Sequence, residues 1–203
     1  MIGKVTIDMA RDFSFKKRAS RYDKGSMGKM SRKFYNLLLK TVELRDGCTV
    51  LDVGCGTGVL LSMMAQQKRI HGFGIDAEEN MVAEAAIKCP GMGIRKSRAE
   101  NMPFEKQIFD VVTVCMAYHH FNDKDGFASE AARVLKPGGA LYIADPHFPA
   151  PVRGVLNAIF RLANVAGEFF GPDEITRRFE PFGFEPDSVA KDGYAQVVKL
   201  RRT

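Results

Sequence analysis

Residues 50–58 read VLDVGCGTG, an apolar run followed by glycines at alternate positions. The run from 50 to 53 predicts a buried strand, and the apolar residues that follow Thr57 predict a helix. Glycine has no Cβ, so the backbone at Gly54, Gly56 and Gly58 can take a positive φ and a ligand can approach it closely. A helix start offers unpaired N–H groups and the positive end of a dipole. Strand, glycine turn and helix start together predict a nucleotide-binding corner.

Length and composition are those of one globular domain. The chain has 203 residues, of which 45% are hydrophobic and 27% charged, so it can bury an ordinary core. No apolar run approaches the roughly 18 residues of a membrane span, and the first residues lack the apolar segment of a secretory signal. The cysteines form no C-x-x-C pair, which favours reduced, mostly buried thiols in a cytoplasmic protein. They are Cys48, Cys55, Cys89 and Cys115.

Positive charge is concentrated near the N-terminus. The net charge is +6, and residues 1–49 hold 12 basic and 5 acidic side chains, whereas the rest holds 18 basic and 19 acidic ones. A solvated helix face is one interpretation of this excess. Attraction of an anionic substrate or of a nucleic-acid backbone is the other.

Strand and helix patterns alternate along the chain after a helical N-terminal region at 1–45. Such alternation predicts a parallel sheet that is covered by helices on both faces. Strands are predicted at 50–53, 69–76, 92–96, 108–116, 140–145, 184–190 and 194–200, and helices at 14–22, 27–44, 57–67, 78–88, 124–136 and 172–182. The segment 146–171 interrupts the alternation with apolar residues at helical spacing. It follows the fifth strand, where open α/β sheets bind ligands, so it is expected to cover the substrate side; simple packing on the sheet is the alternative.

The glycine spacing does not settle which nucleotide binds. A dinucleotide site has the pattern G-x-G-x-x-G with an acidic residue about 20 positions later. Here the third glycine, Gly58, comes one position early, and Asp76 stands at the end of the second predicted strand. An ionised carboxylate at Asp76 can accept hydrogen bonds from both ribose hydroxyls. That argument applies equally to NAD and to S-adenosylmethionine.

Several further motifs follow in order. The sequence has Gly74-Ile75-Asp76, Ala99-Glu100-Asn101-Met102-Pro103-Phe104, Phe109-Asp110-Val111-Val112, His119-His120-Phe121 and Arg133-Val134-Leu135-Lys136-Pro137-Gly138-Gly139. With residues 50–58, they resemble the class I S-adenosylmethionine-dependent methyltransferases, and most of all the ubiquinone/menaquinone C-methyltransferase-like subgroup (methyltransferase type 11). The resemblance implies a single Rossmann-like α/β domain over 1–203. Its three layers would surround a seven-stranded, mostly parallel sheet in which the last strand, at 194–200, is antiparallel.

The resemblance also implies a binding site for S-adenosylmethionine. Gly54 and Gly56, with Cys55 between them, would lie against the methionine part. Asp52 would organise the glycine turn, although it could simply bond to nearby backbone. The other implied cofactor residues are Asp76 at the ribose, Ala77 and Met81 along the adenine, Ala99 at the adenine edge, Cys115 and Met116 near the reactive end, and Tyr22, which would close over the cofactor or else pack as an ordinary helix residue.

Arg98 departs from the family pattern. Relatives usually carry an acidic residue before the alanine, where it accepts a hydrogen bond from the adenine amino group. A guanidinium has no acceptor. Either another group takes that bond, or adenine binds more weakly, or Arg98 stacks on the ring.

The sequence therefore predicts direct, in-line methyl transfer to a small, partly hydrophobic or aromatic acceptor. A general base is optional, and His119 is the best candidate because its ordinary pKa lies near neutrality. Its neighbour His120 is expected to point elsewhere. No metal site is predicted, and the oligomeric state stays open. A protein that binds the cofactor without transferring the methyl group, and a nucleic-acid methyltransferase, are the alternatives.

Overall fold

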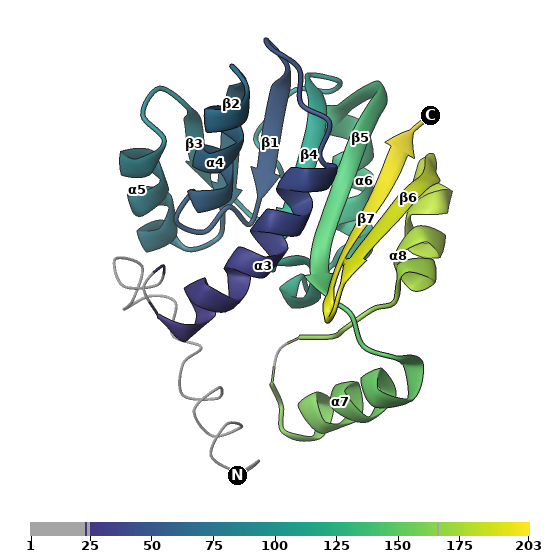
Figure 1. Cartoon of the computed structure of the whole chain (residues 1–203). Coiled ribbons are helices and arrows are strands. Elements are labelled where there is room, and N and C mark those ends of the chain that lie inside the picture. Colours follow the sequence, from purple (N-terminus) through teal and green to yellow (C-terminus); the bar gives the residue numbers. More distant parts are fainter. Residues whose placement is uncertain (1–22, 24, 166) are drawn as a thin grey trace.

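A seven-stranded sheet with helices on both faces forms the centre of the molecule (Figure 1). The computed structural model describes residues 23, 25–165 and 167–203. The strands are β1 (Thr49–Val53), β2 (His71–Asp76), β3 (Gly93–Lys96), β4 (Phe109–Cys115), β5 (Leu135–Pro146), β6 (Phe184–Asp192) and β7 (Ala195–Arg202). The helices are α3 (Ser26–Thr41), α4 (Val59–Gln67), α5 (Glu79–Lys88), α6 (Lys124–Val134), α7 (Ala150–Leu162) and α8 (Pro172–Phe179), with short 3-10 turns at Tyr118–His120 and Glu180–Phe182. Tyr22 and the helix predicted at 14–22 lie outside the described residues.

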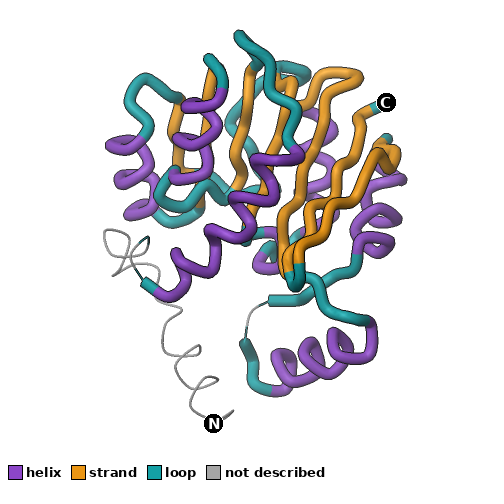
Figure 2. Tube along the Cα trace, viewed as in Figure 1, coloured by secondary structure: helices purple, strands orange, loops and turns teal. Residues whose placement is uncertain are grey.

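The strand order is β3-β2-β1-β4-β5-β7-β6, and only β7 runs against its neighbours. β1 pairs in parallel with β2 and β4, whereas β7 pairs antiparallel with both β5 and β6. The predicted sheet, with its reversed last strand, is thereby confirmed. The tube in Figure 2 shows the strands side by side, with the hairpin of β6 and β7 at one edge.

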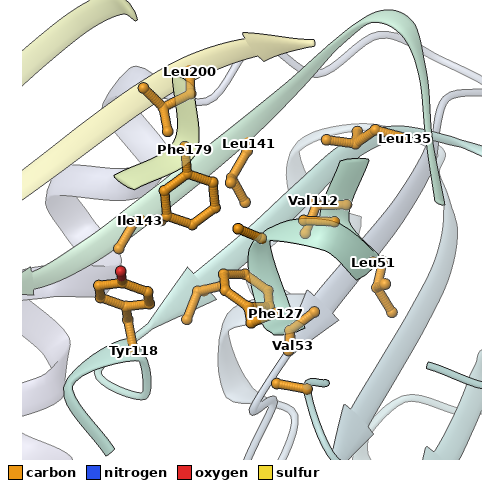
Figure 3. Packing of buried hydrophobic residues seen from close by; sticks show 14 of the residues in the cluster. Leu51, Val53, Val112, Tyr118, Phe127, Leu135, Leu141, Ile143, Phe179 and Leu200 are labelled. Atoms are coloured by element: carbon orange, nitrogen blue, oxygen red, sulfur yellow. The ribbon is translucent and has the colours of Figure 1, made fainter. Parts of the chain in front are cut away.

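Two apolar clusters hold the layers together. Alternate strand residues point to opposite faces, so Leu51 and Val53 pack on one side of β1 and Val50 on the other. The cluster on the first side also contains Phe127 of α6 and Phe179 of α8 (Figure 3). On the second side the sheet packs against α3 and α4.

Element boundaries differ from the sequence prediction where turn residues stand beside a strand. The glycine run after α6 was expected to precede a strand at 140–145, but β5 begins directly at Leu135. Leu135 pairs with Phe109, and pairing then jumps to Val111 and Ala140, so residues 136–139 form an irregularity within the ladder. Nearer the N-terminus, α3 ends at Thr41, whereas the predicted helix continued to residue 44. The Thr41 hydroxyl donates to the carbonyls of Leu37 and Leu38 at 3.1 and 3.0 Å.

The segment 146–171 forms α7 and a return loop beyond the sheet. α7 lies past the edge at which the parallel strands end (Figure 1), and none of its residues is buried. It therefore does not pack on the sheet as a core helix. Within the described part of the chain, no helix is both long and apolar enough to cross a membrane.

Candidate functional site

A cavity of about 310 Å³ opens at the carboxyl ends of β1, β2 and β4. This is the edge at which parallel α/β sheets bind ligands. Of the residues that the sequence indicated for the cofactor, those that line the cavity are Asp52, Gly54, Cys55, Gly56, Asp76, Ala77, Met81, Arg98, Ala99, Cys115 and Met116. They come from separate stretches of sequence and meet because each stretch ends a neighbouring strand or follows one.

The glycine turn after β1 adopts the backbone that its sequence allows. Gly54 and Gly56 have φ of 71° and 53°. A Cβ added to Gly54 would stand 2.6 Å from the Cβ of Ala117, whereas one added to Gly56 would meet nothing within 4 Å. Gly54 is thus needed for packing between the turn and the loop after β4. Gly56 is bare on its open side, where a ligand can approach.

Asp76 fastens this turn to the end of β2. Its Oδ2 accepts a hydrogen bond from the Gly56 N–H at 2.9 Å, and its Oδ1 accepts one from the Glu78 N–H at 2.9 Å. Each oxygen keeps a further lone pair for a ligand hydroxyl. Partial burial raises the pKa of Asp76, although these backbone bonds oppose the shift.

Asp52 is a buried acid in the wall of the cavity. Only 2% of it is exposed, and its Oδ1 accepts a hydrogen bond from the Thr113 hydroxyl at 2.7 Å. Burial raises the pKa of Asp52 to about 7; the Thr113 bond lowers it and the charge of Asp76 raises it further. Near neutral pH the cavity wall can therefore carry either a neutral or an ionised carboxyl.

A polar cluster that the sequence did not reveal holds the other side of the turn. The Thr57 hydroxyl donates to Asp23 Oδ1 at 2.6 Å. Lys88 Nζ, at the end of α5, pairs with the Asp23 carboxylate and donates to Thr57 Oγ1 at 3.2 Å. Asp23 immediately follows the predicted lid residue Tyr22, so this cluster anchors the chain beside the cavity.

Arg98 has a carboxylate partner within its own loop. Its guanidinium pairs with Glu100, and both residues line the cavity beside Ala99. The Glu100 side chain is 20% exposed, against 60% for Arg98. An acceptor of the kind missing at position 98 is thus present two residues later.

The loop after β4 places one histidine in the lining of the cavity and the other just behind it. His119 lies in the 3-10 turn, where its backbone N–H donates to Asp145 Oδ2 at 2.8 Å and its Nδ1 lies 2.9 Å from Asp145 Oδ1. It is 7% exposed, and its ring stacks on Phe169 at 5.7 Å between centroids. His119 is absent from the cavity lining, whereas His120 is part of it.

The expectation that the two histidine rings diverge is wrong. Their centroids are 4.0 Å apart, and both rings belong to the 3-10 turn at Tyr118–His120. Just before it, Met116 has a φ of 56°, a left-handed conformation that is uncommon for a residue with a side chain. Such backbone strain often marks a functional site.

The residues present fit S-adenosylmethionine. The bare face of Gly56 leaves space for a ligand against the turn, and Asp76 keeps lone pairs for ribose hydroxyls. Asp52 provides an ionisable group for a cationic ligand. No group of three or more His, Cys, Asp or Glu side chains suited to a metal ion occurs among the residues that the structure describes.

Comparison with known proteins gives consistent matches. The family described as "Methyltransferase domain" matches residues 51–143. A demethylmenaquinone methyltransferase of Chlorobaculum parvum is 36% identical over 151 residues, which cover 70% of this chain and 63% of the relative, less than two thirds of its length. The corresponding protein of Listeria monocytogenes is 32% identical over 188 residues, which cover 83% of this chain and 79% of the relative.

A solved structure supports the fold over nearly the whole chain. It is a chain from Haloferax volcanii in a complex with the Trm112 methyltransferase activator, with a TM-score of 0.80 and 19% sequence identity. The match covers 93% of this chain and 97% of that chain. At this identity the likeness concerns the architecture alone.

Proposed function

This chain belongs to the class I S-adenosylmethionine-dependent methyltransferases, in the subgroup related to the menaquinone methyltransferases, and we propose that it transfers a methyl group to a small, partly hydrophobic or aromatic acceptor. One observation supports this proposal above the others. The cavity is lined by the residues suited to the cofactor and, at the loop after β4, by His120 and Phe121. Donor and acceptor would therefore meet in one cavity.

The cofactor supplies an electrophilic methyl group on a sulfonium. The protein's task is to hold donor and acceptor in line and to exclude water, and positioning of this kind contributes on the order of 7–11 kcal/mol. In this chain, Gly56 and Asp76 would fix the adenosyl part, and Asp52 would face the positively charged part. Cys115 and Met116 would border the reactive end.

The class of acceptor is inferred from the relatives and from the surrounding side chains. The named relatives are demethylmenaquinone methyltransferases. In this chain Phe148 and Phe160 contact Phe169 at centroid distances of 5.1 and 5.4 Å, and Phe169 stacks on His119. An aromatic acceptor would match this cluster beside the loop after β4.

Proton removal, where the acceptor needs it, is assigned to the histidine pair. Asp145 would fix the tautomer of His119 by accepting from Nδ1. The ring of His120 borders the cavity itself and touches that of His119. We therefore assign His120 as the group that meets the acceptor, with His119 and Asp145 behind it as positioning residues.

The test combines binding and transfer. Calorimetry with S-adenosylmethionine and with S-adenosylhomocysteine should show binding, which Asp76→Ala should weaken. Methyl transfer from labelled cofactor should then reach members of a pool of phenols and quinols. Binding without transfer across that pool would favour a cofactor-binding protein. Labelling of RNA or DNA in preference to the small molecules would favour a nucleic-acid methyltransferase.

A further inference from the structure

We propose that α7 docks this protein on an anionic lipid surface. The proposal deepens the proposed function, because a lipid surface is where a hydrophobic acceptor resides. Only the nature of the acceptor is taken from the proposed function. The docking itself is argued from the contacts of α7.

α7 turns a row of aliphatic side chains away from the protein. A surface helix normally turns its apolar side toward the protein. Here four aliphatic side chains are exposed: Val152 is 48% exposed, Val155 60%, Ile159 44% and Leu162 86%. Their spacing of three or four residues places them along one side of the helix.

Polar side chains hold the opposite side of α7 to the protein. Asn157 Nδ2 donates to the Phe169 carbonyl at 3.0 Å, and the Phe169 N–H donates to Asn157 Oδ1 at 2.9 Å. The Arg153 side chain is 14% exposed, pairs with Glu174 at 2.9 Å and donates to the Phe148 carbonyl at 3.1 Å. These contacts fix the helix with its aliphatic stripe, Val152, Val155, Ile159 and Leu162, facing outward.

The charges of α7 and α3 favour an anionic lipid surface as the partner of this stripe. α7 contains no acidic residue, and Arg161 is exposed in its last turn. α3 also has no acidic residue, and its first half exposes Lys29 and Arg32. Figure 1 shows α7 and the start of α3 toward the same end of the molecule. An exposed aliphatic stripe on a helix that carries basic and no acidic side chains is the pattern of helices that lie in a membrane interface.

The position of α7 connects the lipid surface with the cavity. α7 follows β5 at the edge where the parallel strands end, and the cavity opens at that same edge. Phe160, on the inner side of α7, contacts Phe169, which stacks on His119. A lipid-borne acceptor would thus leave the membrane beside the aromatic cluster that leads to the histidine pair.

The experiment is vesicle flotation, which needs neither cofactor nor acceptor. Vesicles of phosphatidylcholine are compared with vesicles in which part of this lipid is replaced by phosphatidylglycerol. The parent protein should float with the anionic vesicles and much less with the neutral ones. Val155→Ser combined with Ile159→Ser should reduce the bound fraction at least about tenfold, since each buried aliphatic side chain contributes substantially to partitioning. Arg161→Glu should also weaken binding.

Ile87→Ser is the matched control, because Ile87 is a comparable exposed aliphatic residue, 78% exposed, on α5. It should leave flotation unchanged. Absence of flotation by the parent protein, or equal losses in the control and in the double variant, would overturn the proposal. A change from dimer to monomer in the double variant, with flotation unchanged, would assign the stripe to a second copy of the chain.

Failure of docking can be told apart from failure of the proposed function. Methyl transfer to a detergent-dispersed acceptor should persist in the double variant, since neither substituted side chain lines the cavity. Transfer without flotation would reject only the docking. Flotation without transfer would reject only the catalytic proposal.

Discussion

At the scale of single residues, the two central glycines of the turn have different tasks. A methyl group on Gly56 would project into open space at the cavity, whereas one on Gly54 would collide with Ala117. Gly56→Ala should therefore fold with a modest loss, about 1–2 kcal/mol for a left-handed residue with a Cβ. Its affinity for S-adenosylmethionine should fall at least about tenfold, because the new methyl group takes up space that the ligand needs. Calorimetry and urea unfolding measure the two effects.

Gly47 offers the matched control for backbone strain. Its φ is 81°, a Cβ there would meet nothing within 4 Å, and it lies outside the cavity lining. Gly47→Ala should lose similar stability and keep full cofactor affinity. Equal affinity losses in both variants would show that strain in the fold, and not occupation of the cavity, weakens binding.

Glu100 is the second residue whose role can be separated by substitution. If its carboxylate accepts from the adenine amino group, Glu100→Ala should weaken cofactor binding about threefold to tenfold, the usual range for one hydrogen bond. Arg98→Ala releases Glu100 from its ion pair and should leave affinity equal or higher. Calorimetry on both variants decides the matter. A larger loss in Arg98→Ala than in Glu100→Ala would instead indicate that the guanidinium stacks on the adenine.

The local sequence was enough to predict those site residues that stand at the ends of strands. Asp52, Gly56 and Asp76 belong to short patterns at the ends of strands, and parallel strands bring such ends together. The anchor between Asp23 and Lys88 was not predictable, because it joins residues 65 positions apart in the sequence. The orientation of the histidine pair also depends on Asp145, which the local pattern of the loop does not contain.

At the scale of elements, strand interiors were predictable and their ends were not. β4 is buried on both faces, and its β-branched residues Val111, Val112 and Val114 identify it. The junction of α6 and β5 was misplaced because a proline-glycine run normally ends an element, whereas here it lies within an irregular ladder. The helical spacing of α7 was recognised, but the spacing alone cannot tell which side of a helix faces the protein.

The attachment of α7 by Asn157 can be tested directly. Asn157→Ala removes both hydrogen bonds to Phe169 and should loosen α7 with little effect on the rest of the fold, since no residue of α7 is buried. Hydrogen exchange in α7 should accelerate, the free energy of unfolding should fall by no more than about 1–3 kcal/mol, and cofactor affinity should hold. Asn36→Ala, at an exposed asparagine on α3, is the control. Unchanged exchange in α7 would show that other contacts fix the helix.

At the scale of the whole molecule, the strand order is what local patterns determine least. Alternation of strands and helices predicts a parallel sheet, but it does not show that β7 inserts between β5 and β6. The family resemblance implied only that the last strand is antiparallel, which the pairing of the three strands confirms. Alternate residues of β7 pack against both sides of the sheet, with Val198 in one cluster and Val197 in the other. β7 therefore contributes to the core on both faces of the sheet.

Global stability is also linked to the site through Asp52. Its ordinary pKa is 3.8 and its pKa in the folded protein is about 7, so between these values the folded state holds a proton that the unfolded state has released. Unfolding then takes place with proton release, and the contribution of Asp52 to stability falls as pH rises from about 4 to about 7. Above pH 7 the folded protein carries a buried carboxylate and this loss is complete.

Asp52→Asn should remove this dependence, because the amide stays neutral and its oxygen can still accept the Thr113 hydroxyl bond. The free energy of unfolding, measured by urea titration without cofactor at a series of pH values, should be similar for parent and variant near pH 4. The variant should become the more stable one as pH rises to 7, by up to a few kcal/mol at about 1.4 kcal/mol per pKa unit. Groups that do not interact with Asp52 act in both proteins and cancel in the difference, whereas Asp76, whose charge raises the pKa of Asp52, contributes to it. If the stability curves of parent and variant run parallel over this range, Asp52 is ionised in the folded protein well below neutral pH. Solvent would then reach its carboxylate through the cavity more freely than its burial implies.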